Sequence, residues 1–477
     1  MRLDFHRSGG PRGLRDKADA DLEAERLIRA RLQAFEPSWR YLGEETGVGE
    51  GSAGSPIWLV DPNDGTRDYL LGRRGSAVSI GLVHEGRPRL GVVYAFAYPD
   101  DRGDSFAWAE GCGPLRRQDR EVHAALPARL RAGDVVLVSS GGDRDPEGHL
   151  RGADPARYRT LPSIAHRLAV VAAGEAAAAA SVYAPGAWDY AAGQALLRAS
   201  GGTLVDEHGR EVGYAADGRS STRRAFAGSG AVAVELSKRS WELRGAGGGG
   251  WPVRLRRGEA VADPARLGRA QGCLLGLIAA DSAGAFEAGR ELEDDAAEGR
   301  LAGQPRAAAE MALALARSIV AEGRFEPAAA RAAYREWAAS EPPEGDVVEA
   351  ALARAAVLGI LAHAMLGRAG ELARADAAIT GADSATAEAA AVFASAIAQA
   401  VESGEARARA AGAVAAGALF GVTHGRAALP AQWRAMVLSC RPHPLRVRRP
   451  RPRAYWPADV LEIAERLLLA GEAPAER

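Results

Sequence analysis

The chain has 477 residues, of which 47% are hydrophobic and 25% are charged. Single hydrophobic cores usually stop growing at about 250–300 residues, so this length predicts two domains, and the composition is too apolar for general disorder. Sixty basic and sixty-one acidic residues leave a formal net charge of −1, which excludes an overall attraction to nucleic acid or to an anionic membrane.

The N-terminal half mixes helical and strand patterns. Residues 18–32 predict an amphipathic helix, with Leu22, Leu27 and Ile28 near one face. Residues 77–93 predict two strands joined around residues 85–88, which is a hairpin signal. We take residues 1–242 as one α/β domain.

A glycine run marks the end of this half. Residues 244–250 read RGAGGGG, a flexible composition with nothing to bury, and we place a linker at residues 243–262. Long helical patterns rich in alanine and leucine follow, at residues 351–366, 386–401 and 458–471. Residues 263–477 are therefore predicted to form an all-helical domain.

The cysteine content and the lack of long apolar segments bear on the cellular compartment of the protein. Cys112, Cys273 and Cys440 are far apart and odd in number, which excludes a disulfide framework and a CxxC metal site. The first twenty residues contain no apolar core of a signal peptide, and no run of about 18 apolar residues follows. We expect a cytoplasmic protein that does not span a membrane.

The most informative segment is residues 58–68, WLVDPNDGTRD, in which an apolar strand ends in Asp61 and Asp64. Carboxylate oxygens hold Mg²⁺ and leave it several exchangeable positions. The backbone N–H groups of Gly65 and Thr66, at a helix start, can face phosphate oxygens. The segment therefore favours a hard cation beside a phosphate.

Two further acidic positions accompany this segment. Gly43-Glu44-Glu45 lies upstream, and Asp189 lies downstream at the start of an apolar helix, in the run WDYAAG. A single acid at a helix start is often only an N-cap. The three elements together are far more specific than any one of them.

These motifs resemble the inositol monophosphatase superfamily of Mg²⁺-dependent, lithium-sensitive phosphatases. The family's marks are Gly-Glu-Glu, Trp-x-x-Asp-Pro-x-Asp-Gly-Thr and Trp-Asp-x-Ala-Ala-Gly, and all three occur here in order, within roughly residues 19–241. The resemblance implies an α/β layered sandwich of the sugar- and inositol-phosphatase type. It also implies a phosphomonoesterase acting on a small phosphorylated metabolite, two or three Mg²⁺ ions, inhibition by Li⁺ and a homodimer.

The resemblance assigns roles by position. The implied metal ligands are four acidic side chains and one carbonyl group, those of Glu44, Asp61, Asp64, Asp189 and Asn63. Thr66, paired with Asp21, would orient the attacking water, and Gly65 with Thr66 would contact the phosphate. Metal ions in such a site lower the pKa of water, bridge the attacking and leaving oxygens and neutralise phosphate charge.

Two departures from the family pattern bear on stability and on the substrate. The family usually has a helix ahead of the Asp21 region, and this sequence begins too late to supply it. Inositol-acting members carry a substrate-binding Glu seven residues before the last metal Asp, and Val182 stands at that place. Nucleotide-type or ADP-ribose-type phosphates are therefore at least as well supported as sugar or inositol phosphates.

The C-terminal half has a second resemblance. Residues 272–284, GCLLGLIAADSAG, have the small residues of a tightly packed core helix followed by an acid, Asp281. They also resemble the opening motif of the ADP-ribosylglycohydrolase family, an all-helical fold with a two-Mg²⁺ centre. Further landmarks of that family follow in order, at residues 310–317, 354–360, 412–421 and 430–433.

The metal-binding acids of that second family are missing. Residues 306–309 read RAAA where the family has Thr-Asp-Asp-Thr, and residues 405–408 read EARA where it has Asp-Thr-Asp-Thr. Alanine cannot bind Mg²⁺. Other acids, Glu287 and residues 293–295, survive nearby. We predict a degenerate domain that binds an ADP-ribose-like ligand or serves as a docking and oligomerisation surface.

Two alternatives stay open from the sequence. One is a bifunctional enzyme whose C-terminal domain also hydrolyses ADP-ribosyl bonds, and the other is a helical domain that senses such a ligand without turnover. A basic, proline-broken run at residues 441–453 either engages phosphates or, as we prefer, is an arginine-rich connection that wraps the helical domain. Residues 139–142, SSGG, are typical of a turn, which either approaches a phosphate or is an ordinary Gly-Ser turn.

Overall fold

A computed structural model describes residues 17–220, 222–242, 252–253, 255, 260–282, 300–406 and 412–472. It divides into two compact units, residues 1–247 with 256–258, and residues 248–255 with 259–477. Several features of the sequence lie outside the described residues. They are the glycine run at 244–250, Glu287, the acids at 293–295, and residues 407 and 408 at the end of the EARA run.

The N-terminal unit is built on two sheets. The larger sheet has the strand order β2-β1-β3-β4-β5-β6-β7-β8. Its strands are β1 (Arg40–Gly43), β2 (Gly47–Gly49), β3 (Ile57–Asp64), β4 (Ala77–His84), β5 (Arg87–Ala95), β6 (Asp104–Ala109), β7 (Leu115–Arg117) and β8 (Arg120–Val122). β1 and β3 pair in parallel, and the other neighbours pair antiparallel.

The smaller sheet has the order β10-β9-β11-β13-β12. Its strands are β9 (Val135–Val138), β10 (Arg157–Thr160), β11 (Ala178–Ser181), β12 (Thr203–Val205) and β13 (Ala225–Gly228). The strand β9 pairs in parallel with both β10 and β11. The carboxyl ends of these three strands therefore lie at one edge of the sheet.

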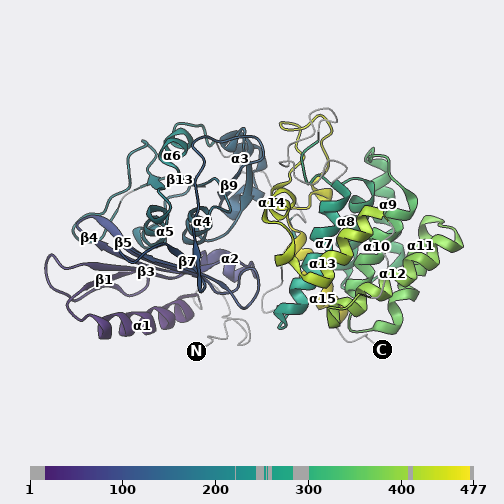
Figure 1. The fold of residues 1–477 in the computed structure, drawn as a ribbon, viewed down its shortest axis with the longest axis horizontal. Coiled ribbons are helices and arrows are strands. Elements are labelled where there is room, and N and C mark those ends of the chain that lie inside the picture. The colour runs from purple at the N-terminus through teal and green to yellow at the C-terminus, as the bar shows by residue number, and fades with distance from the viewer. Residues whose placement is uncertain are drawn as a thin grey trace. The chain divides into compact units, whose positions relative to one another are not determined.

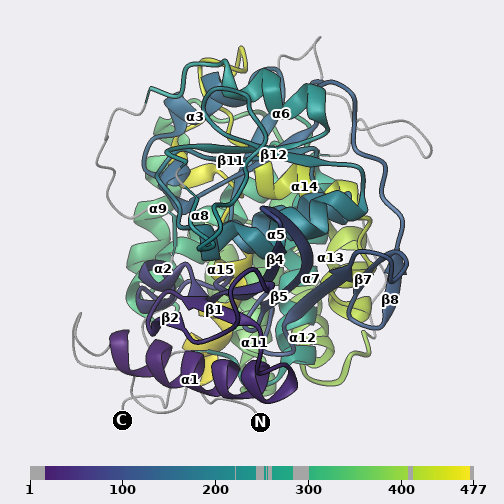
Figure 2. The same cartoon turned by 90° about the vertical axis from the view of Figure 1, so that its left-hand side faces the viewer.

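Helices and sheets alternate in five layers. The helices are α1 (Lys17–Phe35), α2 (Thr66–Leu70), α3 (Pro146–Ala153), α4 (Ile164–Ala172), α5 (Ala187–Ala199) and α6 (Gly230–Ser237). α1 packs beneath the larger sheet, α4 and α5 lie between the two sheets, and α3 and α6 cover the smaller sheet (Figures 1 and 2). The predicted α/β layered sandwich is confirmed.

The predicted hairpin at residues 77–93 is also confirmed. β4 and β5 are joined by Glu85 and Gly86, whose φ angles are 53° and 71°. Two left-handed residues in succession make the tight turn that suits the twist of a hairpin. The second strand therefore begins at Arg87, inside the segment expected to form the turn.

Two glycines seat α5 directly on this hairpin. A Cβ atom on Gly91 would lie 2.2 Å from the carbonyl oxygen of Ala192, and one on Gly81 would lie 2.8 Å from Cβ of Ala191. Any larger residue would push the helix away. Because Asp189 is in the first turn of α5, this close packing helps to fix the position of its carboxyl group.

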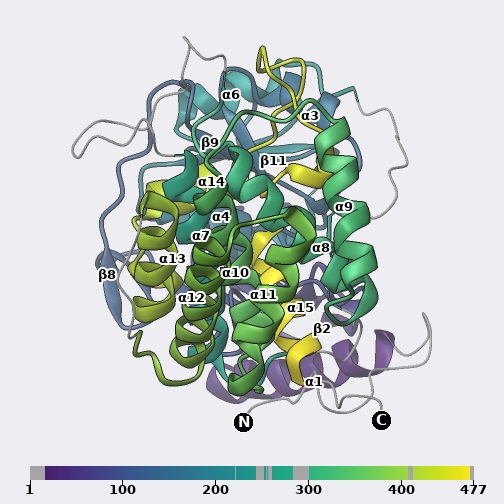
Figure 3. The same ribbon diagram turned by 90° about the vertical axis from the view of Figure 1, so that its right-hand side faces the viewer.

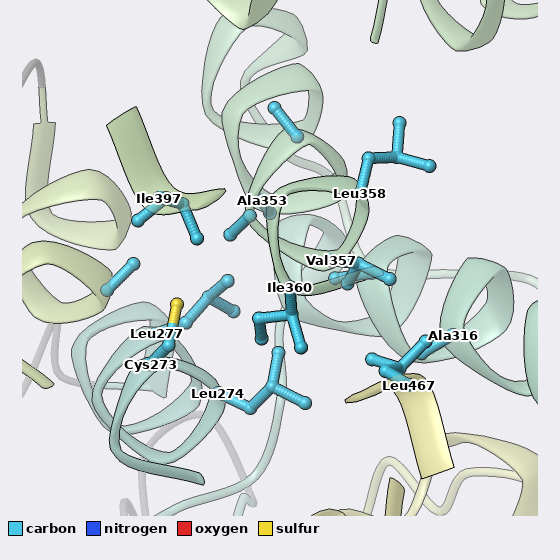
Figure 4. Packing of buried hydrophobic residues seen from close by; sticks show 14 of the residues in the cluster. Cys273, Leu274, Leu277, Ala316, Ala353, Val357, Leu358, Ile360, Ile397 and Leu467 are labelled. Carbon is cyan, nitrogen blue, oxygen red and sulfur yellow. The ribbon is translucent and has the colours of Figure 1, made fainter. Parts of the chain in front are cut away.

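The described secondary-structure elements of the C-terminal unit are all helices, as predicted. Its helices are α7 (Pro264–Ser282), α8 (Ala307–Glu322), α9 (Pro327–Ala339), α10 (Val347–Leu361), α11 (Ala369–Thr380), α12 (Ser384–Ser403), α13 (Gly412–His424), α14 (Ala431–Ser439) and α15 (Val460–Glu472). Figure 3 shows this unit facing the viewer, and Figure 4 shows Val357 and Ile360 of α10 among apolar side chains of α7, α8, α12 and α15. α10 is thus the central helix.

The small residues of α7 form a close helix–helix seam. Cβ atoms on Gly272 and Gly276 would lie 2.2 and 2.1 Å from the carbonyl oxygens of Gly421 and Gly417 in α13. Only glycine lets two backbones approach this closely. The interpretation of residues 272–284 as a tightly packed core helix therefore holds up to Ser282, where the described part of the helix ends.

The described parts of the predicted linker belong to the C-terminal unit. Val253, Leu255 and Val261 are buried. The backbone N–H of Val261 donates to Glu465 at 3.1 Å, and that of Val253 donates to Asp459 at 2.6 Å. These residues therefore pack against the helical unit and do not form a free connection.

The basic run at residues 441–453 packs against the helical unit. Arg441 is buried, and Arg451 forms a bidentate ion pair with the fully buried Glu310, at 2.7 and 2.8 Å. This supports the interpretation of residues 441–453 as a connection that wraps the helical domain.

α12 is the one helix in the described part of the chain that is long and apolar enough to cross a membrane. It packs against α10 and α11, as a core helix does.

Candidate active site

The strand β3 delivers two of the predicted metal ligands to one place. β3 pairs with β4 through Asp61 opposite Ser79 and Asp64 opposite Ala77, so β3 carries one extra residue between the two pairs. In a regular strand, residues three apart point to opposite faces. The bulge corrects this alternation, so the two carboxyl groups face the same side of the sheet.

Asp64 is held by the start of α4. Its Oδ2 atom accepts hydrogen bonds from the hydroxyl group of Ser163 at 2.6 Å and from the backbone N–H of Ala165 at 2.7 Å. Burial raises the pKa of Asp64 to about 6, although these hydrogen bonds act in the opposite direction. The side chain is firmly oriented and yet costly to ionise.

Asp189 approaches the same place from α5. The hydroxyl group of Ser79 donates to the carbonyl of Trp188 at 2.8 Å, which ties the start of α5 to the residue opposite Asp61. The backbone N–H of Gly186 donates to Asp189 at 2.8 Å. Asp189 thus lies near Asp61 and adds to the negative charge around it.

Glu44 completes the set of predicted acidic ligands. It follows β1, it is half-buried, and its backbone N–H donates to the carbonyl of Val60 at 3.1 Å, beside Asp61. Burial, followed by the charges of Asp64, Asp189 and Glu44, raises the pKa of Asp61 well above its ordinary value. Burial and the charge of Asp64 raise the pKa of Asp189 in the same way. The four acids therefore share one electrostatic environment.

The predicted water-orienting pair is linked through Asn63. The side-chain amide of Asn63 donates to Oδ1 of Asp21, on α1, at 3.1 Å. The hydroxyl group of Thr66, the first residue of α2, donates to the carbonyl of Asn63 at 2.9 Å. Gly65 precedes it with a φ of 94°, a left-handed conformation that favours glycine. Asp21, Asn63 and Thr66 are all buried.

This set of residues fits a hard divalent cation by its chemistry. Carboxylate and carbonyl oxygens are the ligands that Mg²⁺ prefers, and mutual repulsion among buried acids is relieved by a bound cation. The amide oxygen of Asn63 is buried without a hydrogen-bond partner. Across the described residues, no three acidic, histidine or cysteine side chains already converge around one point. Instead, Asp64 and Asp189 turn toward protein donors.

Several residues that support the site were not among those predicted from the sequence. Ser163 and Ala165 orient Asp64, and Arg167 is a buried cation whose charge opposes those of Asp64 and Asp189. Burial lowers the pKa of Arg167 to about 10. A serine directly before an apolar helix is a recognisable N-cap signal. An arginine inside the apolar run of α4 was the second available signal.

The helical unit offers a local counterpart at the start of α8. Oδ2 of Asp281 accepts hydrogen bonds from the backbone N–H groups of Arg306 at 2.5 Å and Ala309 at 3.3 Å. Burial raises the pKa of Asp281 to about 7. Ala307, Ala308 and Ala309 are buried in the first turn of α8 and contribute no ligand atom.

Comparisons with known proteins divide the chain in the same way. Residues 14–239 match the inositol monophosphatase family, and residues 262–415 match the ADP-ribosylglycohydrolase family. The inositol-1-monophosphatase of Mesorhizobium japonicum is 35% identical over 203 residues, which cover 40% of this chain and 72% of that protein.

A second relative and a solved structure resemble the same half. The 3′(2′),5′-bisphosphate nucleotidase CysQ of Escherichia coli is 30% identical over 201 residues, which cover 41% of this chain and 78% of that protein. The crystal structure of the extragenic suppressor protein suhB from Bartonella henselae aligns with a TM-score of 0.39 and 26% identity, covering 47% of this chain and 89% of that one.

Proposed function

The chain belongs to the inositol monophosphatase family through its N-terminal unit, and from this premise we propose that it is a Mg²⁺-dependent phosphomonoesterase acting on a small phosphorylated metabolite. The two relatives described above are an inositol-1-monophosphatase and a 3′(2′),5′-bisphosphate nucleotidase, so both are named as phosphatases although their substrates differ. The observation that carries the proposal is the buried acid cluster, in which burial and neighbouring charges raise the pKa values of Asp61 and Asp189.

We assign the cation to the carboxyl groups of the cluster together with one backbone carbonyl, those of Glu44, Asp61, Asp64, Asp189 and Asn63. When bound, a divalent cation supplies charge neutralisation for the phosphate and makes water a better nucleophile at neutral pH. Gly65 and Thr66 follow these ligands directly, so we assign the phosphate contact to their backbone.

Thr66 and Asp21 position the water in this proposal. The proton of the Thr66 hydroxyl group is engaged by the carbonyl of Asn63. Its oxygen therefore keeps lone pairs that accept a hydrogen bond from water. Asp21, fixed through the side chain of Asn63, is the second acceptor and the group that takes up the proton as the water attacks phosphorus.

The substrate we favour is a nucleotide-type phosphate. Val182, at the place of the carboxylate that inositol-acting members use, packs against the apolar core of the smaller sheet. One relative is named for the hydrolysis of nucleoside bisphosphates, and an ADP-ribose phosphate has the same adenosine half. None of the three cysteines, Cys112, Cys273 and Cys440, forms a disulfide, which supports our placement of the protein in the reducing cytoplasm. Dimerisation stays a prediction.

For the helical unit we propose a non-catalytic role. In the first turn of α8, alanines stand where the second family carries acids, and Asp281 is engaged by the backbone of that turn. A bifunctional enzyme would release ADP-ribose from an ADP-ribosylated peptide, and a sensor would bind ADP-ribose without turnover. Both are measured on the full chain by product analysis and by calorimetry.

Phosphate release tests the main proposal. The full chain is assayed with and without Mg²⁺ on inositol 1-phosphate, adenosine 3′,5′-bisphosphate, a sugar phosphate and a phosphorylated ADP-ribose. Release that needs Mg²⁺ and disappears in Asp61→Asn is expected for at least one of them. No release from any substrate by the wild-type protein would overturn the proposal.

A further inference from the structure

Three consecutive residues after β11 have three different surroundings. Ser181 is buried, and its hydroxyl oxygen accepts a hydrogen bond from the guanidinium group of Arg167 at 2.6 Å. Val182 packs against the core of the smaller sheet. Tyr183 is 53% exposed, so it is the one of these three side chains that faces solvent.

The ring of Tyr183 lies on the turn that follows the neighbouring strand β9. A Cβ atom on Gly141 would lie 3.2 Å from Cε2 of Tyr183 and 3.3 Å from its hydroxyl oxygen. Gly141 belongs to a short 3₁₀ helix, η1 (Ser140–Asp143). Since β9 and β11 pair in parallel, the turn and Tyr183 lie at the same edge of the sheet.

The same turn is connected to the segment that carries the acid cluster. The hydroxyl group of Ser140 donates to Asp68 at 2.7 Å, and Asp68 is in α2, four residues after Asp64. The hydroxyl oxygen of Ser139 is buried without a hydrogen-bond partner. It is close to Gly141, since a Cβ atom there would lie 3.3 Å from it.

We propose that Tyr183, supported by Gly141, is the surface on which the base of a nucleotide substrate stacks, with the hydroxyl group of Ser139 as a polar contact beside it. This inference rests on the proposed phosphatase function and names the part of the substrate that decides specificity. An exposed aromatic ring offers a base a π-face of matching size. A polyol such as inositol has no such face and requires hydrogen-bonding groups, which Val182 does not supply.

Variants of the two residues test this. Tyr183→Ala is expected to raise KM for adenosine 3′,5′-bisphosphate about 10-fold or more, which is within the range of base stacking on aromatic side chains, with kcat little changed. Tyr183→Phe keeps the ring and is expected to behave as the wild type. Gly141→Ala places a methyl group against the ring, and an intermediate increase of KM is expected. Hydrolysis of inositol 1-phosphate or glycerol 2-phosphate should be the same in all variants.

A matched control is available in the same unit. Tyr94 is 37% exposed and also lies against a glycine, Gly103. It points to the face of the larger sheet opposite the one on which Gly91 contacts α5, because side chains alternate along β5. Tyr94→Ala should leave KM for both kinds of substrate unchanged.

A binding measurement distinguishes failure of the stacking proposal from failure of the proposed phosphatase function. Adenosine 3′,5′-bisphosphate is titrated into the protein by calorimetry with Ca²⁺ in place of Mg²⁺. If the wild-type protein hydrolyses nothing, the proposed function is wrong. If wild type and Tyr183→Ala bind the nucleotide equally well, or if Tyr183→Ala impairs all substrates alike, the stacking surface is wrong.

Discussion

Asp64 in the N-terminal unit and Asp281 in the helical unit are held in the same local way. Each carboxylate accepts two hydrogen bonds on one oxygen at the start of a helix, from Ser163 and Ala165 for Asp64 and from Arg306 and Ala309 for Asp281. Burial raises the pKa of both, to about 6 and to about 7. Helix capping therefore does not distinguish the two positions.

The two carboxylates differ in the charged groups that surround them. Asp64 shares its surroundings with Asp61, Asp189 and Glu44, whereas the acidic neighbour of Asp281 is Glu349. Other buried acids of the helical unit are paired with arginine, as Glu310 is with Arg451. Several acids that share one buried region indicate a ligand site, whereas a buried acid paired with its own arginine indicates fold stabilisation.

The strongest test of this contrast is a matched pair of substitutions. Asp64→Asn is expected to lower kcat/KM for phosphate release on the order of 10³-fold, because a metal ligand contributes several kcal/mol of charge stabilisation in the transition state. Asp281→Asn removes an equally buried charge from the other unit and should leave kcat/KM unchanged. Circular dichroism at the assay temperature checks that both variants are folded. Equal losses in the two variants would break the contrast.

The paired acids of the helical unit are expected to matter for stability instead. Arg451→Met leaves Glu310 buried without its guanidinium partner, which typically costs about 3–5 kcal/mol. The double variant Glu310→Gln, Arg451→Met should recover most of this loss because no unpaired charge is left. Hydrogen exchange of α8 and α9 measures the effect locally, and phosphate release should be unaffected.

An exposed ion pair in the same unit provides the control for that substitution. Arg374 and Glu388 are 49% and 56% exposed and lie 2.7 Å apart. Solvent screens such a pair strongly, so Arg374→Met should leave hydrogen exchange unchanged. A loss as large as that of Arg451→Met would show that burial of the pair is not the cause.

Addition of Mg²⁺ should slow hydrogen exchange in the N-terminal unit and not at the start of α8 in the helical unit. A ligand present at about 100 times its Kd stabilises the native state by about 2.7 kcal/mol. With Mg²⁺, hydrogen exchange should slow in residues 57–70 and 186–192, where the acids repel one another, and stay constant in residues 303–312 at the start of α8. Ca²⁺ without turnover should act in the same direction. Slowing of hydrogen exchange confined to α8 would show that the cation binds the helical unit, which contradicts the proposed site.

Much of this arrangement could be predicted from the sequence, since the acids occur in short motifs. The spacing of Asp61 and Asp64 gave the strand end and the candidate ligands, and the alanine-rich runs gave the helical unit. The bulge that turns both acids to one face depends on the register with β4. Periodicity alone does not reveal that register.

Long-range contacts account for what the sequence could not predict. Ser163 holds Asp64 from 99 residues away, and Arg451 reaches Glu310 from 141 residues away. Without the tertiary fold, the arginines at 441–453 had two interpretations, and Val253 and Val261 had the composition of a linker. Their burial is decided by packing against helices far along the chain.

The smallest predicted effect concerns acid stability of the N-terminal unit. His166 in α4 is fully buried, with its ring 4.9 Å from that of Tyr98. Burial, together with the charges of Arg117 and Arg159, lowers the pKa of His166 from 6.5 to about 3. The unfolded chain therefore binds a proton below pH 6.5 that the native state refuses, and native stability falls as the pH drops through this window.

His166→Leu should remove this part of the acid sensitivity. At pH 5 the wild type is expected to have lost about 2 kcal/mol relative to pH 8 through this one group, because each pH unit below 6.5 is worth about 1.4 kcal/mol. Urea unfolding at the two pH values measures the difference for each protein, so that any packing change common to both pH values cancels. An unchanged difference in the variant would mean that His166 accepts its proton in the native state, and that the N-terminal unit tolerates a buried cation as well as it tolerates buried acids.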